Sequence, residues 1–237
     1  GLRLPLLLAV TARRGADGRW QARLEQAGAD APEAPSGDDP ATDVIRLSPT
    51  LLEASAEGGN QSWAVDLKWR FAGIDATAAG QQIAVGTVDG TAHYRQQASA
   101  GEGRLVLSLS PVAVRSYRLT ARLKRLSFDL DGTTDRRNPL QMEGRLQVSG
   151  GQVRLAEPAV AAGGFQARLP LAWPPPAKGE PGAFSLASLE WEGRALGTVD
   201  GRLRQLGRGL DFSARHTSRL VPGLAVAVEG RAGLASD

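Results

Sequence analysis

Short segments in which apolar and polar residues alternate with a period of two dominate this sequence. In residues 103–110, Leu105, Leu107 and Leu109 occupy every second position and alternate with Arg104, Val106, Ser108 and Ser110. Successive side chains of a β-strand point to opposite faces, so this spacing places the apolar groups on one side. The same alternation recurs in residues 64–71, 144–149 and 223–229. A chain built from such segments is predicted to form sheets with one apolar and one polar face.

Glycine and proline make long helices improbable. The 237 residues include 29 Gly and 14 Pro, which are the two residue types least favourable in a helix interior. Glycine-containing pairs and triplets separate the alternating runs and predict turns. They lie at residues 58–60, 101–103, 131–132, 150–151, 163–164 and 207–209. The spacing predicts an all-β fold, mostly an antiparallel meander.

One segment, Tyr117–Leu130, fits two periods. Its leucines fall at i, i+4, i+7 and i+11 from Leu119, as on one face of a helix. Leu119 and Leu123 also alternate with charged residues as in a strand, with a change of phase at Arg125 that a β-bulge would absorb. Because both neighbouring segments read as strands, we predict a strand.

The chain is predicted to be a single β segment, spanning residues 1–237, of a longer protein. Residues 27–43 are acidic and rich in proline and have no apolar period, so they are expected to form a mobile loop. Residues 173–182 are also rich in proline and are expected to be an extended connector.

The composition argues against several kinds of chemistry. The chain has no cysteine and two histidines, His93 and His216, so thiol catalysis, disulfides and His-rich metal sites are excluded. No phosphate loop, dinucleotide fingerprint or nucleophile elbow occurs. The net charge of +3 comes from dispersed Arg residues with few aromatics, unlike a nucleic-acid-binding surface. We expect no metal, no cofactor, no nucleic-acid partner and no enzymatic activity.

Residues 126–134 nevertheless resemble the first motif of the haloacid-dehalogenase phosphatases. That resemblance would make Asp129 the nucleophile and Asp131 the acid/base, with magnesium beside them. The motif should end a buried parallel strand, but the preceding run is charged at alternate positions and no acidic pair for magnesium follows. Asp129, Asp131, Thr133 and Asp135 also resemble a calcium loop that lacks its distal Glu. A hairpin turn at Asp131-Gly132 is the preferred interpretation.

The C-terminal third carries a more specific pattern. Residues 185–205 contain apolar strands that end in Leu196-Gly197-Thr198-Val199-Asp200-Gly201, and residues 209–215 and 224–234 follow with Gly-Leu starts and alternating apolar positions. This pattern resembles the strands of the AsmA-like bridge proteins of Gram-negative bacteria, in their YdbH-like or YhdP/TamB-like branches. The resemblance is good over residues 180–237 and looser over 60–170.

The resemblance implies a long, twisted, open β-groove that carries phospholipid acyl chains across the periplasm from the inner to the outer membrane. The anchor in the inner membrane would lie in a segment absent from this chain, and the partners would be phospholipid and components of both membranes. A closed β-sandwich that serves as a binding or adhesion module is the alternative. The expected lipid-facing residues are Leu105, Leu107, Leu109, Leu146, Val148, Leu203, Leu224, Val226 and Val228.

Overall fold

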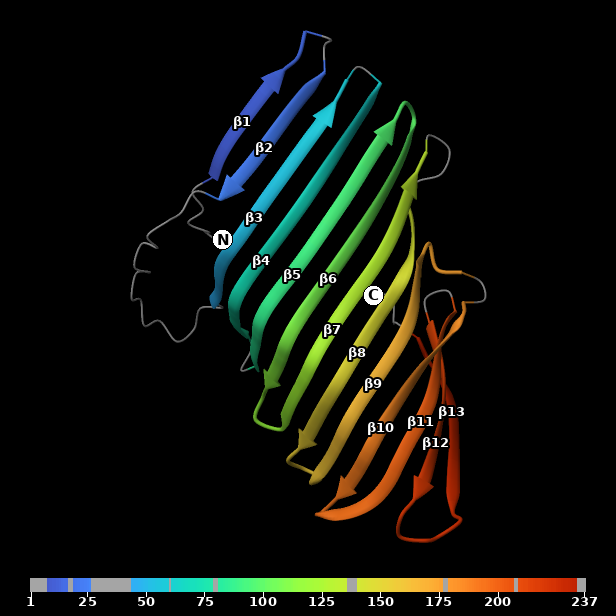
Figure 1. Ribbon diagram of the computed structural model, residues 1–237. Helices are drawn as coiled ribbons and strands as arrows, with labels where there is room; N and C mark the ends of the chain where they lie inside the picture. The colour runs from blue at the N-terminus through green and yellow to red at the C-terminus, as the bar shows by residue number, and fades with distance from the viewer. Residues whose placement is uncertain are drawn as a thin grey trace.

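The fold is one antiparallel sheet whose strands follow each other in chain order. The computed structural model describes residues 8–16, 19–26, 44–59, 61–78, 81–135, 140–176, 179–206 and 209–233. Over these residues thirteen strands each pair with the next strand of the chain (Figure 1). They are β1 Leu8–Arg14, β2 Trp20–Gln26, β3 Val44–Gly58, β4 Ser62–Ala78, β5 Gln81–Gln97, β6 Ala100–Arg115, β7 Leu119–Thr134, β8 Gln141–Leu155, β9 Val160–Trp173, β10 Pro181–Trp191, β11 Arg194–Leu206, β12 Gly209–Ser218 and β13 Ala225–Gly233.

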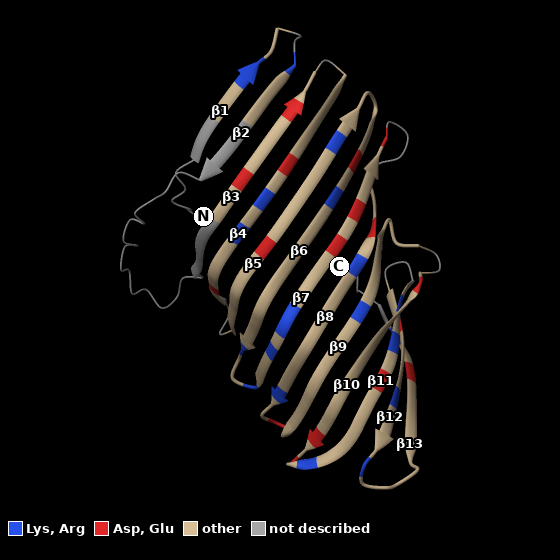
Figure 2. Ribbon diagram, viewed as in Figure 1, with Lys and Arg blue, Asp and Glu red and all other residues tan. Residues whose placement is uncertain are grey.

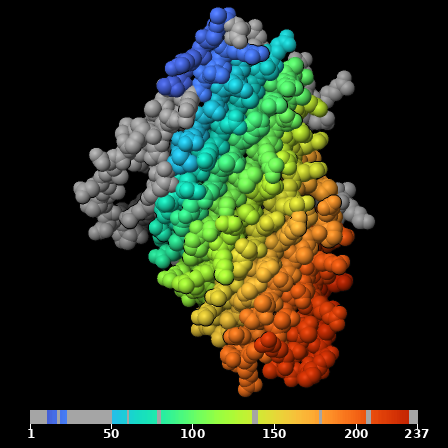
Figure 3. All heavy atoms as spheres, viewed as in Figure 1, coloured from blue at the N-terminus to red at the C-terminus, as the bar shows by residue number. Residues whose placement is uncertain are grey.

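The sheet is open and elongated. β1 and β13 form its two free edges and do not pair with each other. Figure 3 shows the strands as successive bands across the molecule, from blue at one end to red at the other. The predicted all-β meander with an open, twisted sheet is therefore confirmed. The alternative of a closed sandwich is wrong, because the described residues form a single sheet with no second layer.

The register assigns each strand residue to one of two faces. Leu107 lies opposite Phe128, which lies opposite Leu146, so β6, β7 and β8 present apolar side chains in one row. The next row holds Ser108, Ser127 and Gln147. Directly opposed residues of antiparallel strands share a face, so apolar and polar rows alternate between the two faces. We call these the apolar face and the polar face.

Burial in the sheet is shallow. Among the described residues the buried hydrophobic side chains are Val85, Val88, Val148 and Ala167, each 7–9% exposed, and none of the larger side chains falls below 2%. The chain exposes 16,950 Å², whereas a compact protein of 24.9 kDa would expose about 10,000 Å². Over the described residues the structure is a single layer, and no second layer of those residues covers its apolar face.

Seven neighbouring strands, β4–β10, change their apolar phase at a shared level. In β6, for example, Leu109 and Val112 are three residues apart, although residues with odd spacing in a regular strand point to opposite faces. The apolar residues on either side of each change are all buried or half-buried. The positions of the change are Gly73, Gly86, Ser110–Pro111, Lys124–Arg125, Gly150, Gly164 and Ala187, which we call the seam.

The seam runs continuously from strand to strand. A Cβ on Gly86 would lie 2.7 Å from Cδ of Pro111, and one on Gly164 would lie 2.5 Å from Cβ of Ala187. Gly73, Gly150 and Gly164 have φ values of +64° to +70°, which interrupt the alternation of an extended strand. We infer that the seam keeps the apolar residues above and below it on one face, and that it bends the sheet as bulges do.

The Tyr117–Leu130 segment is strand β7 from Leu119 onward, which confirms the preferred prediction. The phase change at Arg125 does not shift the register, because β6 and β8 are interrupted at the same level. It is thus part of the seam rather than an isolated bulge in one strand.

Four of the six predicted turns are wrong. Residues 101–103, 131–132, 150–151 and 163–164 lie inside β6, β7, β8 and β9. Residues 58 and 59 lie at the end of β3, and residue 209 begins β12, whereas residues 60, 207 and 208 lie outside the described residues. The physical reason for the strand glycines is close packing against a neighbouring strand, described below.

The two predicted irregular segments have different outcomes. Residues 27–43 lie outside the described residues. Residues 174–180 connect β9 to β10, so the predicted connector is slightly shorter than 173–182. Within the described part of the chain, no helix has the length and hydropathy needed to cross a membrane.

Candidate functional site

The apolar face is the largest chemically uniform surface of the molecule. β4 and β5 each have 17 residues, so the face is about 56 Å long along the strands. Twelve strand spacings of about 4.8 Å give a similar extent across the sheet. Such an area exceeds by several-fold the few hundred Å² that the largest apolar patch of a soluble monomer covers.

Large aromatic side chains lie flat on this face rather than standing up from it. The Trp69 ring covers Gly90 of the next strand, and the Phe184 ring covers Gly201, so closely that a Cβ on either glycine would overlap the ring. Phe212 covers Gly230 in the same way. This packing makes the face smooth, because each ring fills the space above a glycine of the adjacent strand, which has no side chain.

Eight of the nine predicted lipid-facing residues lie in strands on the apolar face, and the ninth, Leu224, lies just outside β13. Leu105, Leu107 and Leu109 are half-buried in β6, whereas Val148 in β8 is 9% exposed. At the free edge, Val226 and Val228 are 46% and 53% exposed in β13, and Leu224 directly precedes that strand. The remaining two, Leu146 and Leu203, are half-buried in β8 and β11.

Further apolar residues, which the prediction missed, lie between the predicted lipid-facing residues and connect them into one surface. Leu126, Phe128 and Leu130 of β7 lie between the predicted leucines of β6 and β8. Leu169 of β9 and Phe184 of β10 continue the face toward β11. The signal was present, because residues 126–130 alternate as regularly as 105–109, but the change of phase at Arg125 concealed it.

The polar face carries cross-strand ion pairs. Arg104 donates two hydrogen bonds to Asp129 across β6 and β7, with Nη2–Oδ2 at 2.9 Å, and lies 4.0 Å from Asp131. Asp66 lies 2.7 Å from His93, and Arg70 pairs with Asp89. All these side chains are well exposed, so each pair stabilises the sheet little. They identify this face as the solvated one.

At the C-terminal edge, Arg231 lies 2.6 Å from Asp211, and its hydrogen bond holds the pKa of that carboxyl below the usual value. The contribution of this pair to stability is present above the ordinary carboxyl pKa and is lost as the pH falls through the lowered pKa. Replacing Arg231→Ala should therefore raise the pKa of Asp211 in an NMR titration, whereas Arg202→Ala, on the same face but not bonded to Asp211, should leave it unchanged. An unaltered Asp211 titration in the Arg231 variant would contradict the assignment.

The phosphatase and calcium motifs do not form sites of those kinds. Asp129 and Asp131 lie within antiparallel β7, between β6 and β8, rather than at the end of a parallel strand. Both lie near the guanidinium of Arg104, with which they form ion pairs. In the described part of the chain no three His, Asp or Glu side chains are grouped as metal ligands. The preferred hairpin turn at Asp131-Gly132 is also wrong, because the strand continues to Thr134.

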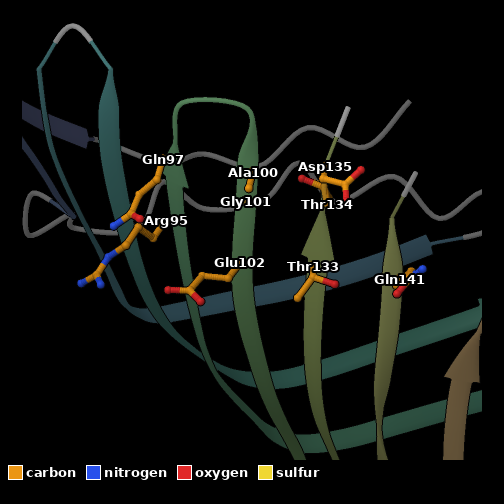
Figure 4. A pocket seen from close by; sticks show the side chains of 9 residues that line it. All are labelled: Arg95, Gln97, Ala100, Gly101, Glu102, Thr133, Thr134, Asp135 and Gln141. Atoms are coloured by element: carbon orange, nitrogen blue, oxygen red, sulfur yellow. The ribbon is translucent and has the colours of Figure 1, made fainter. Parts of the chain in front are cut away.

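Two depressions of the described residues lie mainly on the polar face and have mixed polar and apolar linings. One of about 880 Å³ crosses β6–β11 and is lined by Ser127, Gln147, Arg168 and similar residues. A smaller one of about 290 Å³ lies at the end of β5–β8, where Figure 4 shows Arg95, Glu102 and Asp135.

Comparison of the chain with protein-family models, with curated proteins and with solved structures gives no match.

Proposed function

We propose that this chain is a non-enzymatic section of a periplasmic, AsmA-like β-groove protein that shields phospholipid acyl chains on their way between the inner and outer membranes. The observation that carries the proposal is the apolar face of a single-layer sheet that no second layer of the described chain covers. Shielding requires no reaction, so the proposal needs no catalytic residues.

The hydrophobic effect requires that such a face be covered in water. Each methylene group removed from water contributes about 0.8 kcal/mol, so an acyl chain lying along several rows would be held by many small contacts. The hydrocarbon of one bilayer leaflet is about 15 Å thick, half of the about 30 Å core. A strand of 15–17 residues is therefore longer than one acyl chain, and the face can hold several chains at once.

The texture of the face favours hydrocarbon chains over a second protein layer. Packed protein layers interlock side chains of alternating size to reach crystal-like density. Here the rings of Trp69, Phe184 and Phe212 lie flat over glycines, and the remaining surface is mostly Leu, Val and Ala. A smooth aliphatic surface suits mobile hydrocarbon chains, because they can slide along it without being fixed in one position.

A photocrosslinking amino acid at Leu107 should capture phospholipid in cells. Leu107 is half-buried on the apolar face, next to Phe128. The matched control is Val106, the preceding residue, which lies on the polar face and is 36% exposed. We expect a lipid adduct, identified by mass spectrometry, from Leu107 and none from Val106. Adducts only to protein at Leu107, or equal lipid capture at both positions, would contradict the proposal.

A further inference from the structure

Cations gather on the polar face at one end of β6, β7 and β8. Arg115 and Arg154 flank Thr120 across these strands, and Arg122 lies in the next row. Lys124 and Arg125 follow at the seam. All five side chains are exposed, and Figure 2 shows their blue segments together at the lower ends of the three strands.

These cations lack acidic partners within the described residues, unlike those elsewhere on the same face. Arg70, Arg104 and Arg231 each pair with an aspartate of a neighbouring strand. None of the five clustered cations forms an ion pair, and the acid in the adjacent β8–β9 turn, Glu157, is not bonded to any of them. Neighbouring like charges on a sheet destabilise it. An anionic ligand would remove that repulsion.

Apolar side chains project from the turns at the same end of the sheet. In a meander, alternate turns share an edge, so the β6–β7, β8–β9, β10–β11 and β12–β13 turns lie together (Figure 1). Tyr117 is 83% exposed in the first of these turns, Trp191 is 52% exposed at the third, and Leu220 is 58% exposed in the fourth. Exposed cations accompany them, namely Arg118, Arg194 and Arg219, and the third turn also carries two exposed acids, Glu190 and Glu192, on either side of Trp191. We call these turns and the five clustered cations the basic edge.

The opposite edge differs in charge. Around the β5–β6 and β7–β8 turns, Arg95 is accompanied by three acids, Glu102, Asp135 and Glu143 (Figure 2). An exposed Trp173 occurs there too, at 56%. The same edge carries exposed Arg13 and Arg14 in β1, where Arg14 lies opposite Trp20. Among the described residues, the basic edge carries the larger cluster of unpaired cations beside exposed aromatic residues.

We propose that the basic edge docks on the surface of an anionic phospholipid bilayer. The apolar residues occupy the tips of the turns, and the cations lie one to several residues behind them. This order matches a bilayer interface, where tyrosine and tryptophan rings sit at the headgroup level while arginine side chains reach phosphate. The tips of four turns span about 29 Å at a strand spacing of about 4.8 Å, so they can contact a surface together. A single-stranded nucleic acid would instead need aromatic rings interleaved with the cations along a groove.

The proposal deepens the proposed function, on which it rests, by assigning the side from which lipid enters. Leu119, Ala121 and Leu123 carry the apolar face of β7 down to the Tyr117 turn, and Val153 and Leu155 do so for β8. An acyl chain leaving a bilayer at the basic edge would therefore meet the apolar face immediately. The basic edge is thus formed by the ends of the strands and the turns between them, and not by the edge strands β1 and β13.

Sedimentation of the full chain with vesicles tests the proposal. The chain should bind vesicles of equimolar phosphatidylglycerol and phosphatidylcholine, and should bind phosphatidylcholine alone weakly. Combined Arg115→Glu, Arg122→Glu and Arg154→Glu substitutions should weaken binding to the anionic vesicles by about 100-fold or more, because each cation near an anionic surface contributes about fivefold. The control, Arg145→Glu with Arg168→Glu and Arg202→Glu, changes the net charge equally on the same face but away from the edge, and should retain binding.

The tips provide an independent variant. Tyr117→Ser with Trp191→Ser and Leu220→Ser leaves every charge in place and should still weaken vesicle binding by about tenfold or more, since three apolar insertions are lost. Equal binding of the edge and control charge variants, absence of binding to anionic vesicles, or tighter binding to a single-stranded DNA oligonucleotide than to vesicles would each overturn the proposal.

Phospholipid carried by the purified proteins separates this proposal from the proposed function. If the edge charge variant loses vesicle binding but the parent chain carries no phospholipid in native mass spectrometry, the docking proposal is supported and the proposed shielding of acyl chains is wrong. If the parent carries phospholipid and the edge variant binds vesicles as the parent does, the shielding function stands and the edge proposal fails.

Discussion

The paired substitutions Leu107→Asp and Leu146→Asp should abolish the phospholipid that we expect the parent chain to carry through purification. The two leucines lie in one row of the apolar face, separated by Phe128. A carboxylate against hydrocarbon costs about 3 kcal/mol, so two of them would weaken retention on the order of 10⁴-fold. Native mass spectrometry of the intact protein, with the bound lipid released and identified, measures the loss.

The same variant should remain folded. Both leucines are half-buried on a face that no second layer of the described residues covers, so an aspartate there can keep its charge in water once lipid is absent. In a closed core the substitutions would leave two buried charges and unfold the protein. The matched control places aspartates at Ser108 and Gln147, the next row on the polar face, and should retain both fold and lipid. Loss of the β-sheet circular dichroism signal in the Leu107 and Leu146 variant alone would show that the face is a protein core.

Local alternation predicts the strands and their faces because it is a property of neighbours in sequence. Leu105, Leu107 and Leu109 share a face in any extended conformation, and the structure places them so. Whether that face is covered depends on contacts between distant segments, which alternation does not encode. This is why the sandwich and the open sheet were equally compatible with the leucine pattern.

Glycines were harder to interpret because their role depends on the neighbouring strand. Gly101 and Gly103 read as a turn, yet they lie in β6 beneath the ring of Tyr94, where any larger side chain would collide. Gly150 likewise lies against Lys124 in the neighbouring strand. The partner of such a glycine is known only when the register is known, although an aromatic residue in the adjacent run is a usable signal.

The seam shows the same limit. In β7 the sequence shows the seam as a change in the apolar alternation at Arg125. In β6 the same level carries only a proline, and in β8 it was predicted to be a turn. Only the register shows that Ser110–Pro111, Arg125 and Gly150 lie at one level. Asp129 and Asp131 were similarly ambiguous, because two aspartates at this spacing fit a catalytic motif, a metal-binding loop or a strand that forms ion pairs with its neighbour.

Gly164→Val should lower the free energy of unfolding by about 3 kcal/mol, which corresponds to a fall in Tm of roughly 10 °C for a chain of this size. Gly164 has a φ of +67°, which costs an L-residue about 1–2 kcal/mol, and its Cβ would lie 2.5 Å from Cβ of Ala187. Overpacking at a filled position adds about 1–3 kcal/mol. Thermal denaturation followed by circular dichroism measures the change. Gly59→Val is the control, because that glycine has no atom within 4 Å of its would-be Cβ.

A second substitution separates backbone strain from crowding at the seam. Gly164→Ala should destabilise the sheet through both effects, and Ala187→Gly in the same chain removes the Cβ with which the new methyl collides. The double variant should therefore recover the crowding part of the loss but not the part due to the positive φ, which gives a coupling energy in a double-mutant cycle. Purely additive losses would show that Gly164 and Ala187 do not touch. Gly164 and Ala187 are the seam positions of β9 and β10, and their contact connects the seam across these two strands. Additive losses would therefore also mean that β9 and β10 change phase independently. The two residues would then not contribute to a continuous bend of the sheet.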